Sequence, residues 1–225
     1  MCYNETVSLI TWIIVVCISI LMYKRNKAND RWNATFIITF TLIQLLEAVL
    51  WISIKHNNVH LNQIITRTVL VALWLQPLVQ TYMGYITTGS NFLFILSIVL
   101  ALVFTYYTIY AITSSKNFYT SPGQSCHLVW HQSKDSMTSA NLSTCGNNND
   151  TGLFLTKNKY LTILYLIGLF VPLLFMIPKW QGYVLLFVGI TSFTYAKLTS
   201  SPQEFSSMWC YVAIIYAVVA YIINI

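Results

Sequence analysis

The sequence predicts an all-α polytopic membrane protein, a single bundle of seven transmembrane helices that spans residues 1–225. Two observations predict this fold class. The residues are 56% hydrophobic and only 8% charged, with a mean hydropathy of +0.63, whereas a soluble domain carries roughly 25% charged residues. The apolar residues also gather in seven continuous stretches, and a helix needs about 20 such residues to cross the hydrocarbon core of a bilayer.

The seven predicted spans are each bounded by charged or turn-forming residues. They cover residues 7–23, 34–54, 64–86, 92–113, 160–177, 180–198 and 205–225. Only Pro178 and Lys179 separate the fifth span from the sixth, which predicts a tight turn between two antiparallel helices. The first span has no basic residues before it, so we expect a retained helix and not a cleaved signal peptide.

The distribution of basic residues and sequons predicts the orientation of the bundle. The 24–33 loop is densely basic and is therefore expected on the cytoplasmic side. Lysines also fall on the opposite side, so charge alone does not decide. Glycosylation sequons at Asn4, Asn141 and Asn149 supply independent support, because they mark translocated segments. The sequence thus predicts an outer N-terminus, an inner C-terminus and an outer loop over residues 114–159; a further sequon at Asn33 is then silent.

Four of the five cysteines fall on the predicted outer side. A disulfide between Cys126 and Cys145 would close a loop of about 20 residues and stabilise it by roughly 3 kcal/mol. Cys2 and Cys210 are a possible second pair, which would tie the N-terminus to the top of the seventh span.

Glu47 is the acidic residue set inside an apolar run, in the second span. Gln44 lies three residues before it and Trp51 four residues after it. An ionisable group at this depth is costly, so its presence is by default a hypothesis of function. The functional interpretation is a proton site, a cation site or the counter-ion of a ligand. The alternative is a structural carboxyl that forms hydrogen bonds between helices.

Other polar residues within the spans are candidates for the same pocket. Arg67 either pairs with Glu47 or extends its guanidinium to the surface. Gln76 and Gln80 share one helix face next to Pro77, where freed carbonyl groups can line a cavity; ordinary interhelical hydrogen bonding is the alternative. More hydroxyl-bearing side chains, among them Tyr195, fall in the outer halves of the spans than in the inner halves. This distribution predicts a polar pocket that opens outward.

No catalytic, cofactor or metal site is predicted. The predicted spans contain no histidine, aspartate or deep lysine, and no phosphate loop or nucleophile elbow occurs. His56 and His60, like His127 and His131, have the spacing of one helical face, although solvated loop histidines are the simpler interpretation. No basic patch on a soluble surface indicates nucleic-acid binding.

Short motifs resemble an uncharacterised family of small multi-pass membrane proteins that large DNA viruses of algae and protists encode. The motifs are the opening MCYNETVS, the Gln44/Glu47/Trp51 set, Gln76-Pro77 and SMWC at 207–210. The resemblance implies a viral membrane protein in a host endomembrane, the plasma membrane or a viral membrane, and it supplies no catalytic residues.

The sequence therefore predicts a non-enzymatic integral membrane protein in contact with the lipid bilayer. The favoured function is binding or translocation of a small molecule or ion in an outward-opening pocket around Glu47. The alternatives are a receptor-like protein that signals to a cytosolic partner, and a structural protein of a viral envelope or host membrane. The oligomeric state is not predicted.

Overall fold

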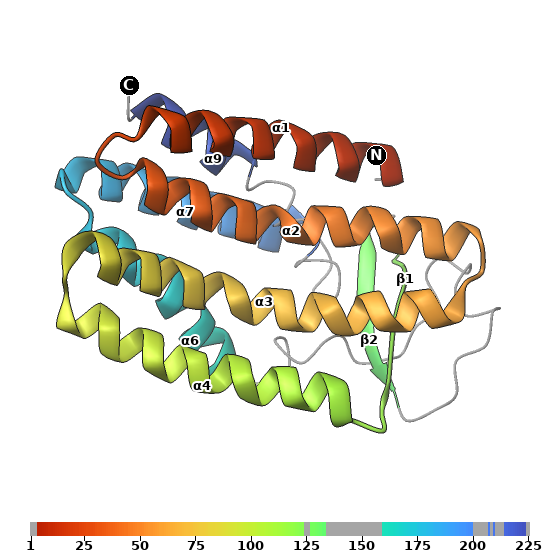
Figure 1. Cartoon of the computed structure of the whole chain (residues 1–225). Coiled ribbons are helices and arrows are strands. Elements are labelled where there is room, and N and C mark those ends of the chain that lie inside the picture. The colour runs from red at the N-terminus through yellow and green to blue at the C-terminus, as the bar shows by residue number, and fades with distance from the viewer. Residues whose placement is uncertain are drawn as a thin grey trace.

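Long helices dominate the computed structural model, which describes residues 4–123, 127–133, 159–199, 207, 209 and 214–223. The first four helices run antiparallel and side by side (Figure 1). They are α1 (Glu5–Arg25), α2 (Asp30–Lys55), α3 (Val59–Thr88) and α4 (Asn91–Thr113). Within the described ranges these four are long and apolar enough to cross a membrane. The first four predicted helices and the membrane-protein class are thus supported, and the total of seven spans stays a prediction.

The second part of the chain forms shorter helical pieces. α6 (Lys159–Phe170) continues as the 3₁₀-helix η2 (Val171–Phe175), and α7 (Lys179–Thr199) and α9 (Ile214–Ile223) follow. The change from α-helix to 3₁₀-helix falls at Pro172, whose nitrogen has no hydrogen to donate to the α-helical ladder. Pro77, by contrast, lies inside the continuous helix α3.

Local sequence signals set the ends of the helices. The Asn4 side chain accepts a hydrogen bond from the backbone N–H of Val7 at 3.0 Å, and Asn58 accepts one from Leu61 at 3.0 Å. Both are N-caps, which satisfy backbone donors that have no partner within the helix. The sequon residue Asn4 therefore has a structural role as the cap of α1.

A β-hairpin covers one end of the bundle and is a feature that the sequence analysis missed. Strand β1 (Asn117–Pro122) pairs antiparallel with β2 (Leu128–Ser133) and packs on α3, at the end of the bundle where α1 begins (Figure 1). We call this the hairpin end, and the opposite end, where α1 turns into α2, the loop end. His131 lies in β2 and contacts the Ser121 hydroxyl at 2.9 Å. The shared helical face considered for His127 and His131 is therefore wrong.

The hairpin is fixed to the bundle by the buried amide of Asn62 in α3. Its Nδ2 donates to the carbonyl of Thr120 at 3.1 Å, and its Oδ1 accepts from the backbone N–H of Thr120 at 2.8 Å. Nδ2 also donates to the Ser53 hydroxyl at 3.1 Å, which links α2 to the same point. The Asn62 side chain thus bonds both backbone groups of Thr120, as a neighbouring strand would, and joins α2, α3 and β1.

Asn62→Ala is expected to free the hairpin from the bundle. It leaves both backbone groups of Thr120 without their partner, so we expect the free energy of unfolding to fall by about 3 kcal/mol. Hydrogen exchange should become faster at the amides of β1 and β2. Asn58→Ala is the matched control, because it removes an exposed cap of the same helix and should cost only about 1 kcal/mol. Equal exchange rates in the two variants would contradict this role of Asn62.

A second set of polar contacts closes the loop end. Asp30 forms a salt bridge with Arg25 at 2.8 Å, and Arg25 also donates to the carbonyl of Tyr221 in α9 at 3.0 Å. Asn29 donates to Gln181 of α7 at 2.7 Å, and Gln181 donates to the carbonyl of Ile223 at 3.2 Å. We call Arg25, Asn29, Asp30 and Gln181 the loop-end cluster. It connects the first turn of the chain to the last described helix.

The contact between η2 and α7 is unusually close at Gly182. A Cβ atom at this position would lie 2.0 Å from the carbonyl oxygen of Leu173. Small residues at helix contacts let backbones approach in membrane bundles. The short helical hairpin predicted around Pro178 is therefore held together by backbone contact.

The two ends of the bundle differ in the segments that they carry. The N-terminus and the hairpin lie at one end, whereas the end of α9 and the α1–α2 turn lie at the other (Figure 1). The predicted topology also groups these segments in this way. The placement of the hairpin end outside stays a prediction of the charge and sequon pattern.

Candidate functional site: a buried carboxyl and a neighbouring cavity

Glu47 is buried in the interior of the bundle, with 3% of its surface exposed. Its Oε2 accepts a hydrogen bond from Gln44 Nε2 at 3.2 Å, one turn away on the same helix. The Ser207 hydroxyl is its second polar neighbour. Oε1 has no hydrogen-bond partner in the described part of the chain. The carboxyl is therefore surrounded by neutral groups and keeps one free acceptor.

Arg67 does not pair with Glu47. Its guanidinium donates to the carbonyl oxygens of Ala111 at 3.1 Å and Lys116 at 3.3 Å, and it lies 5.3 Å from the centre of the Phe118 ring. These carbonyls belong to the end of α4 and the segment after it, where a helix presents partial negative charge. Arg67 thus joins α3 to α4 and the hairpin.

The ion pairs of the described residues lie away from Glu47. They join Arg25 to Asp30 at the loop end and Lys55 to Glu5 at the hairpin end. A buried carboxylate is normally accompanied by a cation or by several hydrogen-bond donors. Among the described residues, Glu47 has no cation beside it.

Gln76 and Gln80 form hydrogen bonds that join helices. Gln76 donates to the carbonyl of Phe40 at 3.2 Å and accepts a hydrogen bond from the Tyr165 hydroxyl. Gln80 accepts from the Trp32 indole at 3.0 Å and donates to the carbonyl of Leu169 at 3.3 Å. Both amides thus form interhelical hydrogen bonds, as the structural interpretation expects, and Gln80 in addition faces a cavity.

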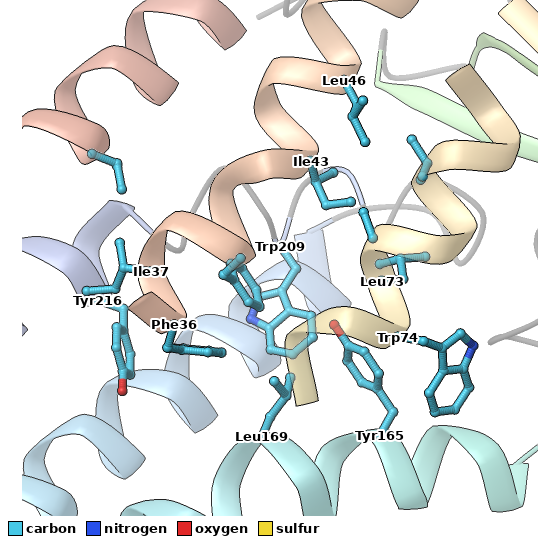
Figure 2. Packing of buried hydrophobic residues seen from close by; sticks show 14 of the residues in the cluster. Phe36, Ile37, Ile43, Leu46, Leu73, Trp74, Tyr165, Leu169, Trp209 and Tyr216 are labelled. Carbon is cyan, nitrogen blue, oxygen red and sulfur yellow. The ribbon is translucent and has the colours of Figure 1, made fainter. Parts of the chain in front are cut away.

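A cavity of about 30 Å³ lies between α2, α3, α6, η2, α7 and α9. Aromatic and aliphatic side chains form most of its wall, with a few polar groups between them. Figure 2 shows Trp209 in the centre of this packing, with Phe36 and Tyr165 on opposite sides of it and Leu169 below. The lining residues are Phe36, Ile37, Phe40, Thr41, Gln80, Leu169, Phe170, Leu173, Gly189, Ser192, Trp209 and Tyr216.

The cavity lies on the loop-end side of Glu47. Its α2 residues come from the first half of that helix, and its α3 residue, Gln80, comes from the second half of α3. Both of these halves lie at the loop end of the bundle. The expected pocket was polar and opened at the outer, hairpin end, so this cavity differs from it in both position and composition. Trp51 and Tyr195 are not part of its wall, and Tyr195 is 54% exposed on α7.

Thr41 connects the cavity to the buried carboxyl. It lines the cavity and lies one turn before Gln44, which in turn donates to Glu47. Residues three apart on a helix are neighbours. Thr41, Gln44 and Glu47 therefore form a polar row along one side of α2, which runs from the cavity toward the hairpin end.

Three buried residues of this region were not singled out as site residues. Trp209 packs edge-on against Phe40 at 5.5 Å between ring centres and donates to the Ser192 hydroxyl at 3.3 Å, so it is a core residue. Tyr216 lines the cavity, and Asn33 is fully buried one turn before Ile37. The signal for Asn33 was present, since it is an amide at the start of an apolar run.

Several predicted residues lie outside the described part of the chain. They are Cys2, Cys126, Cys145 and Cys210, of the two possible disulfides, and the sequon residues Asn141 and Asn149. Cys17, within the described part, is a free thiol on the exposed face of α1.

No family model, curated protein or solved structure matches the chain. The resemblance to a viral membrane-protein family therefore stays a prediction.

Proposed function

We propose that the protein binds a proton or a small cation at Glu47 in the membrane interior, as a step in translocation. The observation that carries the proposal is the set of neighbours of this carboxyl. Gln44 and Ser207 are both neutral, and Oε1 is left without a partner in the described structure. A bound proton or cation would complete the site.

The cost of an isolated charge supports this function. An ionised carboxylate in a low-dielectric interior is unfavourable by several kcal/mol unless a positive charge accompanies it. Arg67 is the basic residue that the sequence offered as a possible partner, but it is bound to the end of α4. A carboxyl that serves packing alone would gain more from a permanent partner.

Glu47→Gln is expected to abolish proton or cation binding while the fold is kept. Glutamine has the same shape and can still form a hydrogen bond with Gln44. We would record infrared difference spectra of the protein in lipid nanodiscs, during an acid-to-alkaline titration and again on addition of Na⁺ or K⁺. The wild type should show a carboxyl band that the variant lacks.

Glu5→Gln is the matched control, because Glu5 is an exposed carboxyl at the hairpin end and pairs with Lys55. Its spectrum should keep the buried carboxyl band. Identical titration and cation spectra in the wild type and Glu47→Gln would refute the proposed site and would favour a structural role. Flux measurements in proteoliposomes then separate translocation from binding without transport.

A further inference from the structure

The amide of Asn33 has no hydrogen-bond partner at either of its polar atoms in the described structure, although its side chain is completely buried. Buried amides in proteins are almost always paired, with protein groups or with ordered water. Asn33 lies on α2 between two known features. Asn29 of the loop-end cluster is one turn before it, and Ile37 of the cavity wall is one turn after it.

The hydroxyl of Tyr216 is a second buried group that forms no hydrogen bond of normal geometry with the described residues, although the Gln80 side chain interacts with it. Tyr216 lies in α9, lines the cavity and is placed next to the Gln80 side chain. The Oε1 atom of Gln80 accepts one hydrogen bond, from Trp32, and a carbonyl oxygen can accept two. The wall thus offers a free donor and a free acceptor on neighbouring side chains.

The volume of the cavity restricts what these groups can bind. A site needs about 10–15 Å³ and two to four polar partners to hold a water molecule. The cavity measures about 30 Å³, which is enough to hold water. Its polar groups, Thr41, Gln80, Ser192 and Tyr216, come from four different helices.

We propose that the Asn33–Tyr216–Gln80 region is a water-binding site that carries protons from the loop end to Glu47. Water there would bond to Asn33, Tyr216 and Gln80. Protons would pass from one water molecule to the next along the row of Thr41 and Gln44, whose side chains hold the water, to the Glu47 carboxylate, which becomes a carboxyl. The delivery step rests on the proposed function of Glu47. It narrows the translocated ion to a proton.

Hydration is tested by radiolytic footprinting of the full chain in nanodiscs, because radicals formed from a bound water oxidise the side chains next to it. Trp209 on the cavity wall should be oxidised in the wild type, and severalfold less in Tyr216→Phe. The exposed Trp180 serves as the internal reference in each sample. Protection of Trp209 in the wild type would overturn the hydrated site.

The melting temperatures of the variants are a second test of hydration, because a hydrated site and a dry site predict changes of opposite sign. If water is bound, Tyr216→Phe and Asn33→Leu remove hydrogen bonds and lower the melting temperature. If the site is dry, both substitutions remove an unsatisfied polar group and raise it. Tyr216→Phe removes only a hydroxyl group, so this variant alone tests whether water is bound if Asn33→Leu does not fold.

Delivery is tested by the rate at which the Glu47 carboxyl band responds to a pH jump imposed at the loop end of oriented vesicles. Tyr216→Phe and Asn33→Leu should slow the response, whereas Thr68→Val, an exposed hydroxyl on α3, should not. If the wild type shows the band and both variants respond as fast as the wild type, the delivery route alone is overturned. A missing wild-type band would instead overturn the function proposed for Glu47, and footprinting would still decide hydration.

Discussion

Asp30→Ala is expected to lower the free energy of unfolding by about 3 kcal/mol, because it leaves a largely buried guanidinium without its counter-ion. Asp30 is completely buried and accepts three hydrogen bonds, from Arg25 Nε at 2.9 Å, from Arg25 Nη2 at 2.8 Å and from the backbone of Lys27 at 2.8 Å. Arg25 also contacts α9 through Tyr221. Hydrogen exchange in α9 should therefore become faster.

The measurement is denaturant unfolding in detergent micelles, and Glu5→Gln provides the comparison. The Glu5–Lys55 pair is formed at 3.1 Å, but its side chains are 35% and 65% exposed. Exposed pairs contribute about 0.5 kcal/mol. If the two variants lose the same stability, the loop-end cluster is not the stabilising contact that the structure describes.

Gly182→Val is expected to be equally severe, since even a Cβ atom would lie 2.0 Å from the Leu173 carbonyl oxygen. Backbone cannot rotate away as a side chain can, so α7 and η2 must separate. Overpacking of this kind costs about 3 kcal/mol. Loss of the short helical hairpin should appear as faster hydrogen exchange in both elements.

Gly189→Ala on the same helix is the control for Gly182. Its added Cβ would meet a ring atom of Phe170 at 2.7 Å, and a ring can turn. We expect a loss of about 1 kcal/mol in this variant. A Gly182→Val protein as stable as Gly189→Ala would show that the two elements are not packed this closely.

Hydropathy predicted the helices because crossing a membrane requires a long apolar run whatever the partners are. It could not predict the partner of Arg67, which depends on the rotation of α3 about its axis and on the position of α4. The hairpin was missed for a related reason. Its strands are six residues each, and Thr120 is held in place by Asn62, a residue 58 positions earlier.

The burial of Glu47 and its contact with Gln44 followed from the sequence context, but the Ser207 contact and the position of the cavity did not. The expected pocket was based on how deep the polar residues lie in the spans. Depth does not show which face of a helix carries a residue. Tyr195, for example, lies on the exposed face of α7, where 54% of its surface is accessible. Trp209 likewise depends on partners far away in the chain, because aromatic contacts with α2, α6 and α7 hold it in the core.

The loop-end cluster also has a consequence for the order in which the protein is made. Arg25, Asn29 and Asp30 leave the ribosome early, whereas Gln181 and Tyr221, which complete their hydrogen bonds, come near the end of the chain. Arg25 and Asp30 can pair as soon as the first two helices are made, but the other hydrogen bonds of Arg25 and Asn29 require the late helices. Until α9 arrives, that end of the nascent bundle is open, and a chain stopped before α9 would expose to quality control a charged surface that the finished protein hides.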